Sequence, residues 1–233
     1  MFVIDGGKAK EKTYDEVNNL ACLLPAWVSR AAARQRRGRA GRVQEGVCFH
    51  LFTREQHAVM AEYQTPELKR TPLEELCLQI KSLRLGLIRP FLAKALEPPA
   101  PKAVENAIEL LGTIGAMDAE AEELTALGWH LAKLPVDPKI GKMLLMGAAF
   151  GCVEPVLTIA AGLAHRDPFV LPMDKKEEAD QMKRELAAGQ HSDHIALLRA
   201  YDGYQRAGNR RDYAWRHFLS ENTLRTAPPP SGA

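Results

Sequence analysis

The chain has 233 residues, of which 46% are hydrophobic and 26% are charged, so it carries enough apolar material for one large folded domain or for two to three small ones. Its net charge of +2 is too small to mark the whole chain as a binder of polyanions. The charge is uneven, however, because residues 28–54 contain seven arginines and one acidic residue, Glu45, which leaves this stretch at +6 and the remainder at −4.

The four cysteines are far apart and fit neither the paired spacing of a zinc site nor a disulfide framework. They are Cys22, Cys48, Cys77 and Cys152. We therefore expect no metal site and an intracellular location, cytoplasmic or nuclear. The longest apolar stretch, residues 143–164, is interrupted by Glu154 and Pro155, so it predicts two buried helices and no contact with a membrane.

The first part of the chain has a mixed α/β pattern. Residues 2–5 and 46–52 predict two strands, and the apolar side chains of the second suit a buried position in a sheet. Between them, residues 10–14 and 20–24 predict the arms of a hairpin. The sequence leaves the role of this hairpin open.

Three helical stripes and an acidic turn follow in residues 66–135. Apolar residues recur at helical spacing within residues 73–83, 104–111 and 127–134. The acidic segment 118–123 lies between the second and third stripes, where it suits the turn of a small β-wing. This pattern predicts a winged helix over residues 66–135.

Residues 135–138 mark a boundary, because two prolines separated by two residues forbid a continuing helix. The remaining apolar pattern predicts a helical bundle over residues 136–225. Its expected helices are residues 139–151, 154–164, 175–188, 193–206 and 211–225. Residues 226–233 have little packing material and are expected to be disordered. The predicted fold class is thus mixed and mainly α.

The most informative segment is residues 35–42, which read Gln-Arg-Arg-Gly-Arg-Ala-Gly-Arg and lie in a helix expected to begin near Arg30, with Ser29 as its N-cap. On an α-helix, Gln35, Arg39 and Arg42 fall at positions i, i+4 and i+7, so they share one face. Gly38 lies between them and leaves room for a bulky anion. Each glycine inside a helix costs about 1 kcal/mol relative to alanine, so this helix needs a reason for its two glycines.

Two interpretations of this basic helix are open from the residues themselves. In the first, the arginines offset the charge on a transferred phosphoryl group, and the glutamine orients a water molecule. In the second, the helix is a solvated basic surface, or binds RNA phosphates without catalysis. Periodicity alone favours the second interpretation.

The order of residue types in this segment resembles a known family. Residues 35–42 match the sixth helicase motif of the DEAH-box RNA helicases at every defined position. Residues 5–8, 70–81, 134–138 and 192–194 also resemble segments of that family, in the same order. The Asp-Gly-Gly at the start of the first of these is similar to the branch that contains RNA helicase A and the quadruplex-resolving helicase, whereas the splicing branch has Asp-Pro-Gly.

The resemblance implies a layout and a function. Residues 1–61 would be the C-terminal part of a second RecA-like lobe, followed by a winged helix (66–135) and a helical ratchet domain (136–225). In the family, ATP with Mg²⁺ binds between two RecA-like lobes, and RNA threads between those lobes and the ratchet. The family's ATP-phosphate positions correspond to Gln35, Gly38, Arg39 and Arg42, of which Arg39 and Arg42 would be catalytic.

The chain also departs from the family pattern. It contains no Gly-rich phosphate loop, no Asp-Glu-Ala-His box and no fifth motif, so the first lobe, with its magnesium ligands, is a missing partner. We therefore expect part of an RNA-stimulated ATPase and helicase that is inactive in isolation, or alternatively a non-catalytic remnant that binds RNA or a protein. A winged helix that reads DNA is disfavoured, because its second helix carries Lys102 but also Glu105 and Glu109.

The sequence assigns no RNA-contacting residue. Ser192 is expected as a helix N-cap, with an RNA contact by Ser192 or His194 as the alternative. The three tryptophans are too widely spaced to predict a base-stacking platform, so we expect them in the core or at an interface. They are Trp27, Trp129 and Trp215.

Overall fold

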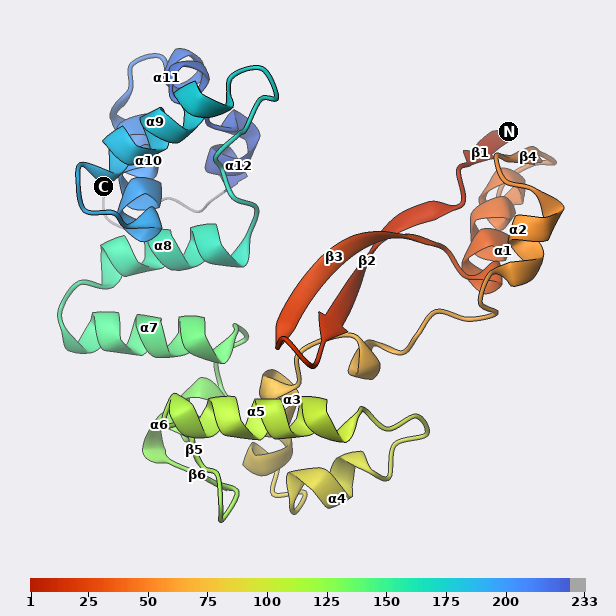
Figure 1. Cartoon of the computed structure of the whole chain (residues 1–233), viewed down its shortest axis with the longest axis horizontal. Coiled ribbons are helices and arrows are strands. Elements are labelled where there is room, and N and C mark those ends of the chain that lie inside the picture. Colours follow the sequence, from red (N-terminus) through yellow and green to blue (C-terminus); the bar gives the residue numbers. More distant parts are fainter. Residues whose placement is uncertain (227–233) are drawn as a thin grey trace. The chain divides into compact units, whose positions relative to one another are not determined.

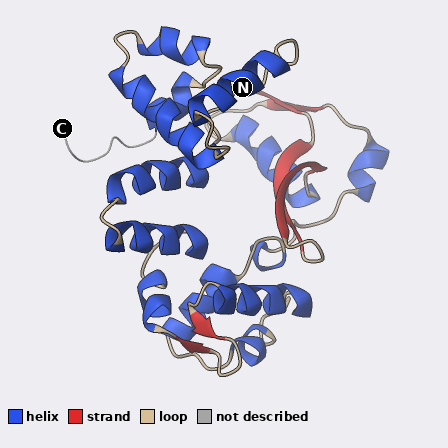
Figure 2. Cartoon of the chain, turned by 60° about the vertical axis from the view of Figure 1, so that its left-hand side comes forward, coloured by secondary structure: helices blue, strands red, loops and turns tan. Residues whose placement is uncertain are grey.

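A computed structural model describes residues 1–226, which form a mixed and mainly α structure, as predicted. Strands occur in the N-terminal part and in one small hairpin, and helices make up most of the rest (Figure 1, Figure 2). Contacts between residues divide the chain into two compact units, and the boundary along the chain falls between Ala132 and Lys133. Thr226 ends the last described helix, and the rest of the predicted disordered tail, 227–233, lies outside the described residues.

The first unit opens with a parallel pair of strands. β1 (Phe2–Asp5) pairs with β4 (Val47–His50) from Phe2 opposite Val47 to Asp5 opposite His50. Helix α1 (Arg30–Gly38) packs against β1, and the short helix α2 (Arg54–Val59) follows β4.

The predicted buried position of the second strand is wrong. Side chains alternate between the two faces of a strand, and the outer face of this pair carries Phe2, Ile4, Val47 and Phe49. Phe2 is 74% exposed and Phe49 is 52% exposed, and their rings stack with centroids 6.3 Å apart. These exposed fractions show that the outer face of the β1–β4 pair is accessible within residues 1–226.

The predicted hairpin is confirmed, with longer arms. β2 (Lys8–Asp15) pairs in antiparallel fashion with β3 (Leu20–Trp27). Its tip contacts the winged-helix region: the side-chain amide of Asn106 donates to the Tyr14 hydroxyl at 3.2 Å and to the Glu16 carbonyl at 2.8 Å. A buried asparagine on an otherwise apolar helix face thus has its partners in the hairpin.

Helices and a small wing complete the first unit. They are the 3-10 turn η2 (Glu67–Lys69), α3 (Glu74–Ser82), α4 (Ile88–Leu92), α5 (Pro101–Thr113), β5 (Met117–Asp118), β6 (Glu123–Leu124) and α6 (Ala126–Leu131). The acidic turn lies between β5 and β6, as predicted. Helix α4 was not predicted. Leu83 is 64% exposed rather than part of the core stripe, because α3 ends before it and Arg84 takes a left-handed conformation with φ 56°.

The wing turn is pinned by a buried carboxylate. Glu122, at φ 50°, is 4% exposed. Its side chain accepts hydrogen bonds from the backbone N–H of Ile88 at 2.7 Å and from the Arg89 guanidinium at 3.2 Å. The wing is therefore held against the start of α4.

Helices make up most of the described part of the second unit. They are α7 (Pro138–Ala149), α8 (Val153–Ala164), α9 (Lys176–Ala187), α10 (Asp193–Arg206), α11 (Arg210–Arg216) and α12 (Glu221–Thr226). The first four match their predictions, and Ser192 caps α10 by accepting from the Ile195 N–H. The single helix predicted over 211–225 is wrong. Phe218 breaks it at φ 53°, and Leu219 turns inward to form a β-bridge with Phe169.

Residues 143–164 span the end of α7 and all of α8, so two helices are present as predicted. The prediction that both are buried is wrong, because only part of each helix is buried and Phe150, just after α7, is 81% exposed. In the described part of the chain, no helix has the length and apolar character needed to cross a bilayer. None of the three tryptophans lies in the core: Trp27 and Trp129 are partly exposed, and Trp215 is 84% exposed.

The core of the winged helix offers a direct test of the fold. Leu111 is completely buried, so Leu111→Ala should lower the free energy of unfolding by about 2–5 kcal/mol through lost burial and a cavity. Leu96 is fully exposed, and Leu96→Ala should change it by less than about 0.5 kcal/mol. Urea denaturation of the two variants measures both changes. Equal effects would contradict this core.

Candidate nucleotide phosphate site

The arginine-rich segment is a capped α-helix that tightens at its end. Ser29 caps α1, its hydroxyl accepting from the Ala32 N–H at 3.1 Å. The α-helix ends at Gly38, and the 3-10 helix η1 (Arg39–Gly41) continues it. The prediction of one regular α-helix through Arg42 therefore needs correction. Since residues three apart eclipse in a 3-10 helix, Arg39 and Arg42 project on the same side.

The side chains predicted to meet phosphate face outward. Ala33 and Ala40 turn inward and are buried, whereas Gln35, Arg39 and Arg42 are exposed. Within residues 1–226, these three exposed side chains form no hydrogen bond or ion pair. The segment therefore presents two guanidiniums and an amide that are free to bind an anion.

The two glycines of the segment have no packing reason in the described structure. A Cβ at Gly38 or Gly41 would meet no atom within 4 Å. Neither residue has a positive φ, so the backbone does not require glycine either. The two glycines destabilise the helix relative to alanine, and no contact within residues 1–226 compensates for this cost. Glycine at these positions is consistent with the close approach of a ligand.

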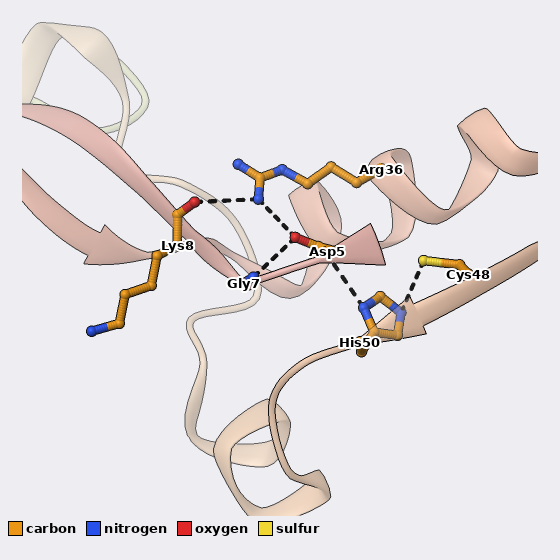
Figure 3. Close-up of polar contacts among 6 residues, drawn as sticks. All are labelled: Asp5, Gly7, Lys8, Arg36, Cys48 and His50. Atoms are coloured by element: carbon orange, nitrogen blue, oxygen red, sulfur yellow. Dashed lines mark hydrogen bonds and ion pairs between the residues drawn. The ribbon is translucent and has the colours of Figure 1, made fainter. Parts of the chain in front are cut away.

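One arginine of the segment faces inward instead. The Arg36 guanidinium donates to the Asp5 carboxylate at 2.9 Å and to the Lys8 carbonyl at 3.4 Å (Figure 3). The same Asp5 oxygen accepts from the Gly7 N–H at 2.9 Å. The other Asp5 oxygen lies 3.5 Å from Nδ1 of His50, at the end of β4. These contacts join α1, β1 and β4 at one buried carboxylate.

The electrostatics of Asp5 follow from this cluster. Its side chain is only 2% exposed, and burial by itself raises the pKa of a carboxyl group. The hydrogen bonds from Gly7 and Arg36, with the charge of Arg36 and the nearby His50, outweigh burial and hold the pKa of Asp5 below its ordinary value. Asp5 is therefore ionised at neutral pH and forms a firm ion pair with Arg36.

Gly7 fixes the backbone beside this carboxylate. It adopts φ +71°, and a Cβ there would lie 2.5 Å from the ring of Phe52. Its carbonyl accepts from the Val28 N–H at 2.9 Å, which closes the base of the hairpin. Only glycine fits this position, so the second glycine of the Asp-Gly-Gly sequence has a structural reason.

The donors of the segment suit an anion rather than a metal. Guanidinium and amide groups bind phosphate oxygens, whereas Mg²⁺ takes oxygen ligands, mostly carboxylates and water. Within the described residues, no group of three His, Cys, Asp or Glu side chains could hold a metal ion. Gln35, Gly38, Arg39 and Arg42 thus fit the phosphate part of a nucleotide and leave its Mg²⁺ to other residues.

Comparison with known proteins indicates the class of protein to which this chain is similar. The winged-helix part of the helicase associated domain (HA2) family matches residues 107–136, and its ratchet-like part matches residues 137–197. The chain is 61% identical over 97% of its length to the DExH-box ATP-dependent RNA helicase DExH1 of Arabidopsis thaliana. It is 51% identical over 96% of its length to the ATP-dependent DNA/RNA helicase DHX36 of Homo sapiens, and 46% identical over 97% to the ATP-dependent RNA helicase DHX29 of the same species.

These matches confirm the resemblance to DEAH-box helicases. The chain belongs to the DEAH/DExH-box helicase family and contains its helicase-associated winged-helix and ratchet-like domains. It spans only 23% of the Arabidopsis relative, 23% of human DHX36 and 17% of human DHX29. The sixth-motif residues lie within these alignments, but their roles stay predictions.

The buried ion pair predicts a pH dependence of stability. Because the folded-state pKa of Asp5 is lowered, its ionised form stabilises the fold above the unfolded-state pKa, and this contribution disappears as the pH falls through the folded-state value. Asp5→Asn should lower the free energy of unfolding at neutral pH by about 1.5–3 kcal/mol, the range for hydrogen bonds to charged groups.

The difference between Asp5→Asn and the parent should shrink at acidic pH. Urea denaturation at pH 7 and at decreasing pH measures it, with the exposed Asp180→Asn as the matched control. A difference that stays constant across this pH range would contradict the assigned ion pair.

Proposed function

We propose that this chain supplies one edge of the ATP site of an RNA-stimulated NTP hydrolase that unwinds RNA. In this proposal Gln35, Gly38, Arg39 and Arg42 face the phosphate groups of ATP. The main support is that two exposed arginines on one side of the segment have no partner within residues 1–226. Beside them lie two glycines that no contact within the same residues requires.

The chemistry follows from the donor groups. Phosphoryl transfer needs little covalent help from a protein, so catalysis consists mainly of positioning and of offsetting charge on the transferred group. Arg39 and Arg42 would place two planar guanidiniums on the phosphoryl oxygens as that charge shifts in the transition state. Gln35 would orient the attacking water. Gly38 keeps the space between these side chains open.

The remaining parts of the site would come from residues outside this chain. A first RecA-like lobe would hold the β-phosphate and Mg²⁺ with a phosphate loop and an acidic box. The segment that contains α1 would face this lobe across the bound nucleotide. RNA would be bound on the winged helix and the ratchet-like domain, in keeping with relatives named as RNA helicases. Such a protein would act inside the cell, in the cytoplasm or the nucleus.

A non-catalytic role is the second candidate, and one observation favours it. Arg37 and Arg34 are exposed as well, so the helix carries positive charge beyond the face of Arg39 and Arg42. A surface of this kind binds RNA phosphates through charge alone, with a strong dependence on salt. The two candidates differ in whether Arg42 affects turnover or affinity for RNA.

The chain alone should hydrolyse no ATP. It contains nothing that holds the β-phosphate and Mg²⁺ as a phosphate loop and an acidic box do. Steady-state ATPase measurements on the purified 233-residue chain, with and without RNA, test this expectation. Turnover stimulated by RNA in protein free of contaminating ATPases would overturn it.

In a longer protein that also carries a first lobe, Arg42→Ala should lower turnover by at least about tenfold, because arginines on the transferred phosphoryl contribute roughly 10³ to 10⁵ in rate. Affinity for RNA should change little. Arg42→Lys should restore little activity, because an ammonium group lacks the planar fork. The measurements are ATPase rates at saturating RNA and RNA binding at fixed salt.

Arg37→Ala is the matched control. Two positions from Gln35 on an α-helix is a rotation of about 200°, so Arg37 lies on the opposite side, and its removal should leave turnover within a few-fold of the parent. If Arg37→Ala and Arg42→Ala weaken RNA binding equally and spare turnover, the segment is a basic RNA-binding surface.

A further inference from the structure

We infer that Arg36 is a positioning residue that ties the phosphate-facing helix to the root of the hairpin β2–β3, with Asp5 as the shared anchor. This inference rests on the proposed function, because it concerns how the helix that carries Gln35 is held. Arg36 follows Gln35 directly, about 100° further around the helix, and its guanidinium points inward, toward Asp5 and Lys8 (Figure 3).

The contacts of Arg36 lead directly into the hairpin. Lys8 is the first residue of β2, and its carbonyl accepts from the same guanidinium nitrogen that donates to Asp5. Gly7, just before it, donates to Asp5 and accepts from Val28, which follows the end of β3. Arg36 thus contacts the start of β2 directly, and it is linked to the end of β3 through Asp5 and Gly7.

This root has little freedom to adjust without Arg36. Asp5 is almost completely buried, and its second carboxylate oxygen has no hydrogen bond and only His50 nearby. Loss of the guanidinium would leave a buried charge with the Gly7 N–H as its remaining hydrogen-bond donor, which is strongly unfavourable. Gly7 cannot be replaced by a bulkier residue, because Phe52 fills the adjoining space.

The far end of the hairpin is held too. Asn106 of α5 donates to Tyr14 and to the carbonyl of Glu16, on either side of the start of the turn. The hairpin therefore joins two fixed points in the first unit: α1 through Arg36 and Asp5, and α5 through Asn106. A shift of α1 on binding or loss of a phosphate would reach the winged helix along this hairpin, because ladder hydrogen bonds connect its arms over their full length.

The expected consequence is a loss of coupling between RNA and ATP turnover. In a longer protein carrying both lobes, Arg36→Ala should lower the ratio of RNA-stimulated to basal ATPase activity by at least about fivefold, the lower end of usual coupling between sites. Arg36→Lys, which keeps a cationic donor for Asp5, should recover part of the ratio. Asp5→Asn, which keeps the shape and removes the charge, should act like Arg36→Ala.

Amide hydrogen exchange in the 233-residue chain gives a readout independent of turnover. Arg36→Ala should speed exchange in the hairpin root, residues 8–12 and 23–28, more than in the tip, which Asn106 holds. Arg37→Ala, the adjacent exposed arginine, is the control and should leave both the exchange pattern and the activity ratio near those of the parent.

The outcomes separate this inference from the proposed function. In one outcome, Arg36→Ala and Asp5→Asn match Arg37→Ala in both hydrogen exchange at the hairpin root and the activity ratio, while Arg42→Ala loses turnover. Arg36 then does not position the hairpin, and the phosphate site stands. If Arg42→Ala keeps full turnover, the phosphate site itself is wrong. Faster root exchange together with a lowered ratio in both Arg36→Ala and Asp5→Asn supports the inference.

Discussion

The buried carboxylate of Asp5 is the constraint on which the N-terminal part of the structure depends. A charge removed from water is tolerated only when it is paired and hydrogen-bonded, and here Arg36 and the Gly7 N–H supply both. This pairing fixes the rotation of α1 against β1. It therefore decides which arginines of a repetitive basic segment turn inward and which, Arg39 and Arg42, face solvent.

Local patterns in the sequence were sufficient for most elements, because helix caps, apolar stripes and hairpin turns act within a few residues. The N-caps Ser29 and Ser192 are where they were predicted, and four helices of the second unit match. Features that depend on distant contacts were missed. The break at Phe218 lies where Leu219 pairs with Phe169. Phe49 is exposed although its segment is apolar, because burial depends on which distant elements pack on the strand.

The candidate site shows the same division. The shared face of Gln35, Arg39 and Arg42 could be predicted from helical spacing, although the structure tightens the last turn into a 3-10 helix. The role of Arg36 could not, because its partner Asp5 is 31 residues away and no local rule separates Arg36 from Arg37. What the structure adds to the motif is thus a distinction among its arginines, between one that holds the helix and two that remain available to a ligand.

The most direct test of this distinction is a structure of a longer protein that carries both lobes, determined with ADP, Mg²⁺ and aluminium fluoride as a mimic of the transferred phosphoryl. The account predicts guanidinium nitrogens of Arg39 and Arg42 at about 2.7–2.9 Å from the fluoride ligands, the range of charge-assisted hydrogen bonds, with Arg36 still on Asp5. Arg39 and Arg42 turned away from the nucleotide, or Arg36 in their place, would contradict it.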